Sequence, residues 1–277
     1  MPKLSPQPPA PALKRLATLL RPHGRLAVLL SGGVDSSLLA AAAASALGPG
    51  RVLALTFASP LTPEEDLAAA RSVAAQLGLR QAVLPYDALG IPEVAGNSPL
   101  RCYACKREVI RLAKEAAAAE GFRILAEGSN AGDMDGALRP GIRAVREAGI
   151  LSPLAEAGLG KAAVRHLARA LSLAVSERPS SPCLATRFPT GHRLTAAEVS
   201  LVAIAERELR ALGLSVVRLR WRGVGEVALE VGEAELALAK SRRPAIEARL
   251  TALGLRLACA PLPYGQEKAP ARGGGLV

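Results

Sequence analysis

Short apolar runs alternate with longer segments of helical spacing through the first half of the chain. Continuous runs rich in Leu, Val, Ile and Ala are typical of strands buried on both faces of a sheet. They occupy residues 25–30, 51–57, 81–85 and 122–126. Apolar positions three or four residues apart predict helices over residues 13–20, 36–47, 62–77 and 105–120. Strands that alternate with helices predict an α/β fold, in which helices cover both faces of a parallel sheet.

The pattern changes after Pro182. A helix is predicted over residues 195–212, where Thr195 and Glu198 form a capping box. The elements predicted after it are two strands, a helix and a last strand, over residues 215–221, 226–231, 233–253 and 255–260. This order indicates a smaller α+β domain that serves substrate or oligomer contacts. We therefore expect a Pro-rich tail, an α/β domain, an α+β domain and a flexible tail, over residues 1–12, 13–182, 183–265 and 266–277.

Composition narrows the class of protein. Of 277 residues, 50% are hydrophobic, so most of the chain is expected to fold around a core. Lys and Arg number 35 against 24 Asp and Glu, and the net charge of +11 favours an anionic partner such as a nucleotide or RNA. Only 3% of residues are aromatic, which argues against base stacking on a single strand. The apolar stretch 26–50 contains Asp35, so we expect no membrane span and a cytoplasmic protein with reduced thiols.

The heptapeptide SGGVDSS, residues 31–37, stands between a predicted buried strand and a predicted helix. Gly32 and Gly33 allow a positive φ and a close approach of the backbone to an anion. N–H groups at a helix N-terminus favour phosphate, and hydroxyl donors are available on Ser31, Ser36 and Ser37. Asp35 suits contact with Mg²⁺ or a capping role. A ligand-free turn is the alternative, but the complete heptapeptide in this position favours a phosphate site.

SGGVDSS resembles the pyrophosphatase loop of the ATP pyrophosphatase (PP-loop) superfamily. It lacks the Gly-Lys-Ser/Thr of a Walker loop. The resemblance implies that ATP is cleaved between its α and β phosphates. A substrate oxygen is then adenylylated, pyrophosphate leaves, and a nucleophile displaces AMP. The loop indicates the activation chemistry and leaves the substrate open.

The four cysteines differ in context. Cys102 and Cys105 form a Cys-x-x-Cys pair ahead of a predicted helix, Cys183 stands alone, and Cys259 is expected to pack in the core of the last strand. The pair alone fits a redox disulfide, half a zinc site, cluster ligands or two free thiols. The three His residues lack ligand spacing, which argues against a four-ligand zinc site. Thiolates of Cys102, Cys105 and Cys183 together would suit a [4Fe–4S] cluster with one open iron.

Several motifs in order sharpen the resemblance. They are residues 97–106 (NSPLRCYACK), 127–133 (EGSNAGD), 139–144 (RPGIRA), 152–154 (SPL) and 182–187 (PCLATR). Together with SGGVDSS they resemble the LarE family, the ATP-dependent sulfur transferases of lactate racemase cofactor maturation. The resemblance extends over about residues 13–265, and several ordered motifs are far more specific than one.

The resemblance to LarE implies a substrate and a sulfur source. Carboxylates of a pyridinium-3,5-dicarboxylate mononucleotide would be adenylylated and converted to thiocarboxylates for a nickel-pincer cofactor. Sulfur would come from a hydrosulfide on a [4Fe–4S] cluster held by Cys102, Cys105 and Cys183, or from Cys183 itself, which would become dehydroalanine. The family also implies homo-oligomers and a sulfur donor protein as partners.

Further residues are candidates for binding ATP or substrate. After the fourth strand, Gly128, Ser129 and Asn130 are predicted to contact the nucleotide, with Asp133 as a second Mg²⁺ contact. Thr56 and Phe57 end the second strand and are predicted to line the adenine pocket. Phosphates are possible partners of Lys106, Arg139 and Lys161, although single basic residues are more often solvated. The family suggests an Arg-x-Arg at Arg218 and Arg220 and a glutamate at Glu230, while Ala228 departs from its pattern. Arg187 is a further predicted anion contact, and an exposed strand face is the alternative for the Arg pair.

Three other functions remain open on the sequence. A tRNA-thiolating PP-loop enzyme would use the same chemistry and is favoured by the positive charge, but the chain has no recognisable RNA-binding module. An ammonia-using nucleotide synthetase would need no Cys183. An ATP-dependent scaffold or sensor would bind ATP without releasing pyrophosphate. Salt-sensitive tRNA affinity, activity of a Cys183→Ser variant and pyrophosphate release distinguish the three.

Overall fold

The computed structural model describes residues 11–134 and 139–265. Within these ranges the chain forms two compact units. Residues 11–86, 102–134 and 139–181 make the first, and residues 87–101 and 182–265 make the second. That residues 87–101 belong with the C-terminal unit was not predicted from the sequence. Of the two predicted tails, only residues 11 and 12 lie inside the described ranges, and they open the first helix.

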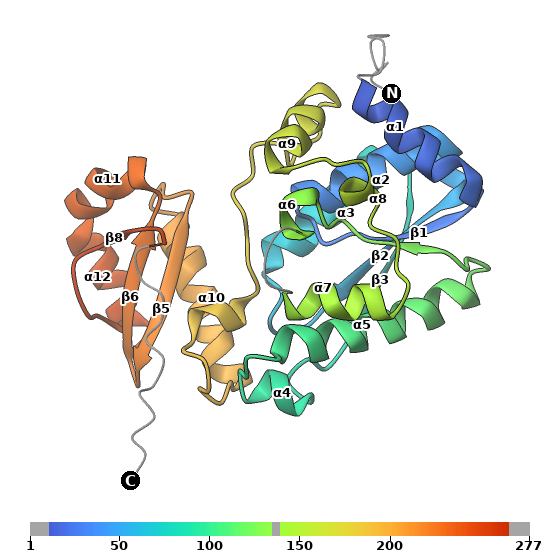
Figure 1. Cartoon of the computed structure of the whole chain (residues 1–277). Helices are drawn as coiled ribbons and strands as arrows, with labels where there is room; N and C mark the ends of the chain where they lie inside the picture. Colours follow the sequence, from blue (N-terminus) through green and yellow to red (C-terminus); the bar gives the residue numbers. More distant parts are fainter. Residues whose placement is uncertain (1–10, 135–138, 266–277) are drawn as a thin grey trace. The chain divides into compact units, whose positions relative to one another are not determined.

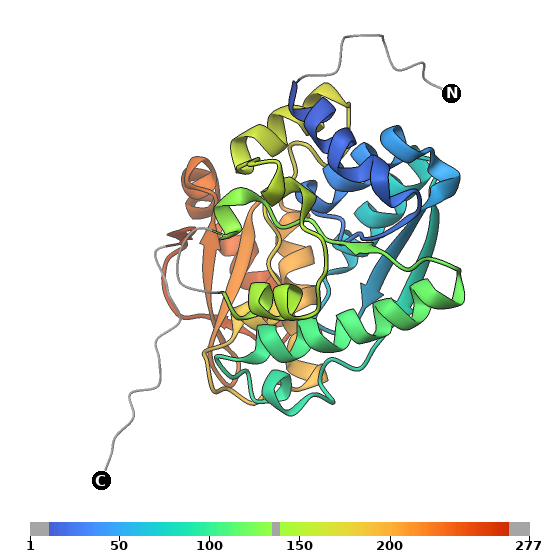
Figure 2. The ribbon, with the colours of Figure 1, turned by 45° about the vertical axis from the view of Figure 1, so that its right-hand side comes forward.

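A four-stranded parallel sheet forms the centre of the first unit (Figures 1 and 2). Its order is β3-β2-β1-β4, and the strands are β1 Leu26–Leu29, β2 Val52–Ala58, β3 Arg80–Pro85 and β4 Leu125–Ala126. Neighbouring strands pair in parallel, with Leu26 opposite Val52 and Ala27 opposite Leu125. All four residues of β1 are buried, as continuous apolar runs predict. The predicted α/β fold is confirmed.

Helices cover both faces of this sheet (Figure 1). The first unit contains α1 Pro11–Leu20, α2 Val34–Leu47, α3 Glu64–Gln76, α5 Arg101–Ala119, α6 Ala131–Met134, α7 Pro140–Glu147, α8 Pro153–Glu156 and α9 Lys161–Ala170. Apolar side chains of α1, α2, α3, α8 and α9 form one core with β1 and β2, and those of α5 and α7 form the other. The end of β1 leads directly into the N-terminus of α2, and the candidate phosphate loop lies between them.

The second unit is a smaller mixed sheet with helices. Strands β5 Val217–Gly223 and β6 Glu226–Val231 are an antiparallel hairpin, and β7 Arg256–Leu257 and β8 Leu262–Pro263 run parallel to β6. Its helices are α4 Pro92–Ala95, α10 Ala196–Arg210, α11 Leu236–Ser241 and α12 Arg243–Ala252. Thr195 caps α10 by accepting a hydrogen bond from the N–H of Glu198, as predicted.

Asn97 joins the two chain segments of the second unit. Its fully buried side-chain amide donates to the carbonyl oxygens of Ala185, Phe188 and Pro189, at 3.4, 3.2 and 2.8 Å. Its own backbone has a φ of 45°, a conformation that Asn tolerates better than most residues. The short segment around α4 is thus an integral part of the C-terminal unit.

Three predicted elements differ from the structure. Helix α5 begins at Arg101, so Cys102 and Cys105 lie in its first turns and not ahead of it. The helix predicted over 233–253 is divided at Arg242, because Pro244 has no N–H and its ring would clash with the carbonyl one turn earlier. Of the strand predicted over 255–260, only Arg256 and Leu257 form a strand, β7, and β8 begins beyond the predicted range at Leu262. Cys259 lies between β7 and β8 and is half-buried, so the prediction of a core position was wrong.

None of the helices within the described ranges has the length and apolar content needed to cross a membrane.

Candidate functional site

The loop after β1 has the conformation that its glycines predict. Gly32 has a φ of +79°, and a Cβ atom there would lie 2.1 Å from the carbonyl oxygen of Asp66. Gly33 is extended and forms the N-cap of α2. Gly33 is exposed and Gly32 is buried, so the backbone of the loop meets solvent at Gly33. Backbone N–H groups at this helix start are therefore available to an anion.

The serines of the loop mainly stabilise its own backbone. Ser36 and Ser37 are buried, and their hydroxyls donate to the carbonyl oxygen of Gly33 at 3.1 and 2.8 Å. Ser36 also accepts from the N–H of Ser31 at 3.2 Å. Ser31 is exposed, with its hydroxyl 3.1 Å from that of Ser36. Of the three predicted hydroxyl donors, Ser31 is therefore the one that faces solvent.

Asp35 lies in a charged cluster beside the loop. Its carboxylate forms an ion pair with Lys161 and accepts from the side-chain amide of Asn130 at 3.1 Å. Asp133 accepts from the backbone N–H of Asn130 at 3.2 Å and pairs with Arg139 at 2.8 Å. The structure thus gathers three residues that the sequence assigned to the nucleotide and Mg²⁺, together with Lys161 and Arg139, which it named as possible phosphate partners.

The cluster fits a magnesium ion. Mg²⁺ is held in proteins by one or two carboxylates together with substrate phosphates. Asp35 and Asp133 supply two carboxylates, and the ammonium of Lys161 already neutralises Asp35 as a cation would. Across the ranges described, no three His, Cys, Asp or Glu side chains are arranged to hold a metal ion by themselves.

The turn after β4 closes against the phosphate loop. A Cβ atom at Gly128 would lie 2.7 Å from the backbone nitrogen of Ser36, so only glycine fits without displacement. Glu127 is buried and accepts from the N–H and hydroxyl of Ser129 at 3.0 and 2.9 Å, and from Ser152 at 2.7 Å. The hydroxyl of Ser129 is therefore directed at Glu127, while Asn130 reaches Asp35.

Thr56 and Phe57 lie at the end of β2, as predicted. The buried hydroxyl of Thr56 donates to the carbonyl oxygen of Leu30 at 2.7 Å, immediately before the loop. The ring of Phe57 meets Tyr86 edge-on, with centroids 6.0 Å apart. Their predicted contact with adenine stays a prediction.

Cys102 and Cys105 are one turn apart on α5, a spacing that places both on one helix face. Cys102 is exposed, and Cys105 is half-buried with its sulfur 3.2 Å from the hydroxyl of Tyr86. Burial raises the pKa of the Cys105 thiol, although the hydroxyl of Tyr86 acts in the opposite direction. The first unit thus supplies two of the three predicted cluster ligands. Cys183 belongs to the second unit, and the convergence of all three stays a prediction.

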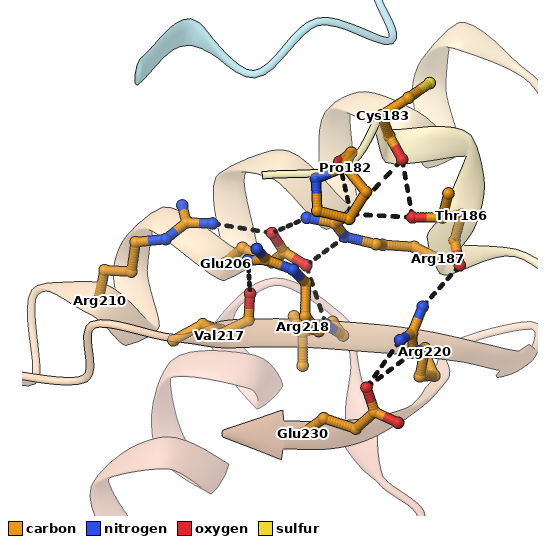
Figure 3. Close-up of polar contacts among 11 residues, drawn as sticks. Pro182, Cys183, Thr186, Arg187, Glu206, Arg210, Val217, Arg218, Arg220 and Glu230 are labelled. Atoms are coloured by element: carbon orange, nitrogen blue, oxygen red, sulfur yellow. Dashed lines mark hydrogen bonds and ion pairs between the residues drawn. The ribbon is translucent and has the colours of Figure 1, made fainter. Parts of the chain in front are cut away.

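A turn of 3₁₀ helix over Leu184–Arg187 holds the backbone of Cys183, whose side chain is exposed. The carbonyl oxygen of Cys183 accepts from the hydroxyl of Thr186 at 2.8 Å and from Arg187 at 3.4 Å. Arg187 also donates to the carbonyl of Pro182 at 2.8 Å. Figure 3 shows the sulfur of Cys183 directed away from the guanidinium group of Arg187.

The position of Arg187 corrects the prediction that it contacts a substrate anion. Its side chain is 0% exposed, and Glu206 accepts from its Nε and Nη2 at 2.7 and 3.0 Å. Arg210 and the backbone N–H of Leu219 also donate to this carboxylate, both at 2.9 Å (Figure 3). Because no part of Arg187 reaches solvent, the structure assigns it to supporting the segment around Cys183.

Arg218 and Arg220 are on one face of β5, as alternation along a strand requires. Arg220 donates to Glu230 at 2.7 Å and to the carbonyl of Thr186 at 2.7 Å, so it too supports the Cys183 turn (Figure 3). Arg218 is 3% exposed, and burial and the nearby charge of Arg187 lower the pKa of its guanidinium. The alternative of an exposed strand face is excluded for both residues. Their predicted contact with a substrate anion stays a prediction.

We expect Glu206→Ala to destabilise the protein by about 3–5 kcal/mol, because it leaves the buried charge of Arg187 without its partner. Glu208→Ala is the matched control on the same helix. Glu208 pairs with Arg249 at 2.5 Å, and both side chains are at least 35% exposed, so we expect a cost of at most about 1 kcal/mol. Urea denaturation of both variants measures the difference. Equal costs for the two would contradict a stabilising role of the buried pair.

Four buried or half-buried charged residues near the sites have no role predicted from the sequence: Asp66, Glu127, Arg178 and Glu206. Two of them carried a signal. Glu206 follows Val199 and Val202 at helical spacing on the buried face of α10, and Asp66 precedes Ala70 and Val73 in the same way on α3. A carboxylate on an apolar helix face indicates a buried partner.

Comparisons with known proteins support the assignment of the loop. The model of the NAD synthase family matches residues 21–90. A protein of Lactiplantibacillus plantarum named pyridinium-3,5-bisthiocarboxylic acid mononucleotide synthase is 32% identical over 242 residues, which is 87% of each chain. An uncharacterized protein of Synechocystis is 37% identical over 71% of this chain and 72% of its own, and one of Methanocaldococcus jannaschii is 26% identical over 71% and 73%. Identity at this level over nearly the whole chain confirms the predicted family, and the chain belongs to the LarE family of PP-loop proteins.

Proposed function

We propose that this protein is an ATP-dependent sulfur transferase that converts carboxylates of a pyridinium-3,5-dicarboxylate mononucleotide to thiocarboxylates. The observation that carries the proposal is the loop of Gly32 and Gly33 at the start of α2. Over 87% of its length, the chain is also 32% identical to a protein that is named as the synthase of the corresponding product. That a nickel-pincer cofactor is the final product follows from the family and belongs to the same proposal.

The reaction consists of two displacements, the first at the α-phosphorus of ATP and the second at the carboxyl carbon of the substrate. A carboxylate oxygen attacks the α-phosphorus of ATP, the bond to the bridging oxygen breaks, and pyrophosphate leaves with its electron pair. A sulfur nucleophile then attacks the acyl carbon of the adenylate. The C–O bond to AMP breaks, AMP leaves, and a thiocarboxylate remains. No oxidant or reductant is needed for either displacement.

The first unit supplies groups for the first displacement. Backbone N–H groups at the start of α2 would bind the departing pyrophosphate, which carries the negative charge that builds up during the step. Asp35, Asn130 and Asp133 would hold Mg²⁺, which screens the phosphate oxygens. Lys161 pairs with Asp35. When Mg²⁺ replaces Lys161 beside Asp35, the ammonium group of Lys161 would be free to neutralise a phosphate.

The cysteines supply the sulfur in one of two ways. Cys102, Cys105 and Cys183 would hold a [4Fe–4S] cluster, which would supply hydrosulfide as the sulfur nucleophile. If no cluster is held, the thiolate of Cys183 attacks the acyl carbon and displaces AMP, which gives a thioester. Loss of the Cα proton of Cys183 to a base and cleavage of its Cβ–S bond then release the thiocarboxylate and leave dehydroalanine in the chain. In both cases Cys183 is required, and the Arg187–Glu206 pair positions its backbone. A homo-oligomeric state and a protein that reloads sulfur are parts of the same proposal.

The test measures products with defined substrates. The purified protein, kept anaerobic, is given ATP, Mg²⁺ and the pyridinium dicarboxylate mononucleotide, with unmodified tRNA or ammonium in parallel reactions. We expect pyrophosphate and AMP only with the pyridinium substrate, and a thiocarboxylate by mass spectrometry. Thiolated tRNA or an amide product would replace the proposal, and ATP binding without pyrophosphate would indicate a sensor.

The source of sulfur is tested separately by iron and sulfide analysis after anaerobic purification. We expect about four irons per chain, lost on Cys102→Ala. Cys259→Ala is the matched control, since Cys259 lies between β7 and β8 and has no proposed role. An iron-free wild-type protein that still makes thiocarboxylate, with loss of one H₂S from the mass of Cys183, would assign the sulfur to that residue.

A further inference from the structure

Arg178 bridges the phosphate loop and helix α3. Its Nη1 donates to the carbonyl oxygen of Gly32 at 3.2 Å, and its Nη2 lies 2.7 Å from the carboxylate of Asp66. The side chain of Arg178 is 25% exposed. Its backbone is held in turn by Arg165 of α9, which donates to the carbonyl oxygens of Ser176 and Arg178 at 2.9 and 3.0 Å.

The contact with Gly32 fixes the orientation of one peptide group. In a planar trans peptide the C=O of one residue and the N–H of the next point in opposite directions. A guanidinium that holds the carbonyl of Gly32 therefore turns the N–H of Gly33 to the opposite side. Gly33 is exposed, and its N–H has only a long contact, 3.5 Å, with the hydroxyl of Ser31.

A second carbonyl of the loop is fixed in the same manner. The carbonyl of Gly33 accepts from the hydroxyls of Ser36 and Ser37 and from the N–H of Ser37, at 3.1, 2.8 and 3.1 Å. The carbonyl oxygens of Gly32 and Gly33 are thus both held by hydrogen bonds from side chains. The N–H groups of the same two peptide units, those of Gly33 and Val34, are left as the donors of the loop.

Asp66 fixes Arg178 in place. It lies in the first turn of α3, is 8% exposed, and its backbone oxygen is the atom that a Cβ at Gly32 would strike. Burial raises the pKa of its carboxyl group, while the charge of Arg178 and a hydrogen bond from Ser181 oppose that change. Arg178, Asp66 and Gly32 therefore form one contiguous contact set.

We propose that Arg178 is a positioning residue for the phosphate loop: held by Asp66, it binds the Gly32 carbonyl and thereby directs the Gly33 N–H at the pyrophosphate part of ATP. This inference rests on the proposed use of ATP and extends it to a residue 146 positions beyond the loop. Arg178 acts through the backbone and does not itself bind phosphate.

The test is the affinity for inorganic pyrophosphate, measured by titration calorimetry with Mg²⁺ present. Arg178→Met is expected to weaken binding of pyrophosphate and ATP by about tenfold or more, the effect of one lost hydrogen bond to a charged group. Binding of adenosine, which has no phosphate, is expected to stay unchanged. Arg169→Met is the matched control. Arg169 forms an exposed ion pair with Glu177, the residue before Arg178, and within the described ranges no contact of Arg169 with the phosphate loop is found.

Asp66→Asn separates positioning from direct phosphate contact. If Arg178 works by holding the loop, Asp66→Asn also weakens pyrophosphate binding. If Arg178 binds phosphate directly, releasing it from Asp66 leaves the affinity unchanged or strengthens it, and the inference is overturned. Arg178→Lys, which keeps the charge but cannot bridge two oxygens as a fork, is expected to give an intermediate loss and replaces Arg178→Met if that variant does not fold.

The wild-type protein separates this inference from the function on which it rests. If the wild type binds neither ATP nor pyrophosphate, the proposed function fails. If the wild type binds both and the Arg178 variants bind them equally well, only the positioning role fails.

Discussion

Replacing Cys183 by Ser is expected to abolish thiocarboxylate formation while the protein still releases pyrophosphate in a single-turnover burst. The reason is that, in the proposed reaction, adenylylation would use the loop of the first unit, whereas the second displacement would need the sulfur of Cys183, either as cluster ligand or as donor. The side chain is exposed, and the backbone around it is fixed by Thr186 and Arg187, so the smaller oxygen should not disturb the fold. Rapid-quench measurement of pyrophosphate, with mass spectrometry of the nucleotide, follows both steps.

Cys259→Ser provides the comparison within the same unit. Cys259 is half-buried between β7 and β8 and has no part in the proposed chemistry, so full activity is expected. Thiocarboxylate made by the Cys183→Ser variant at the wild-type level would contradict the proposed role of Cys183 in sulfur transfer. An amide formed with ammonium at equal rates by the variant and the wild type would instead favour an ammonia-using synthetase, which needs no thiol.

Gly32→Ala is expected to weaken ATP binding by about tenfold or more and to suppress pyrophosphate release with it. A φ of +79° costs a residue with a Cβ about 1–2 kcal/mol, and about 1.4 kcal/mol corresponds to a factor of ten in affinity. The new methyl group would also lie 2.1 Å from the backbone oxygen of Asp66, so the loop must move away from α3. Calorimetric titration with ATP, and a thermal melt to check folding, measure the effect.

Gly33→Ala tests whether the effect depends on position. Gly33 has a φ of −80°, which any residue adopts, and its added Cβ would meet only the hydroxyl of Ser31 at 3.5 Å. We therefore expect a much smaller loss than at Gly32. Equal losses at both positions would mean that the methyl groups obstruct the ligand itself and that backbone geometry is not the cause.

The central strands β1 and β2 of the first unit could be predicted because they are largely apolar. Strand β1 is buried at every position, so periodicity along the sequence and burial in the structure report the same property. The short helices α6, α7 and α8 were not predicted, since they are four to eight residues long and offer too few turns for a period to emerge. Helix ends are the least predictable part of an element, and α5 begins at Arg101, four residues before the predicted start.

The candidate site was predictable where it is local in sequence. SGGVDSS, the turn at Gly128 and Asp35 with Asn130 stand at strand ends, where parallel sheets bind ligands. Arg178 had no such signal, because its contact with Gly32 depends on how residues 146 positions apart meet. Arg187 was misassigned for a related reason: a cation next to a reactive cysteine suggests an anion, and only the fold reveals that Glu206 already satisfies it.

The contribution of Asn97 bears on how this protein can be divided. A fragment that starts at Pro182 would carry the hairpin β5–β6 but not the Asn97 amide that donates to the carbonyl oxygens of Ala185, Phe188 and Pro189. The C-terminal unit is therefore not a transplantable module: gene fusions that exchange it at a single junction would separate it from residues 87–101. During synthesis on the ribosome, that early segment must wait for almost a hundred further residues before its partners emerge.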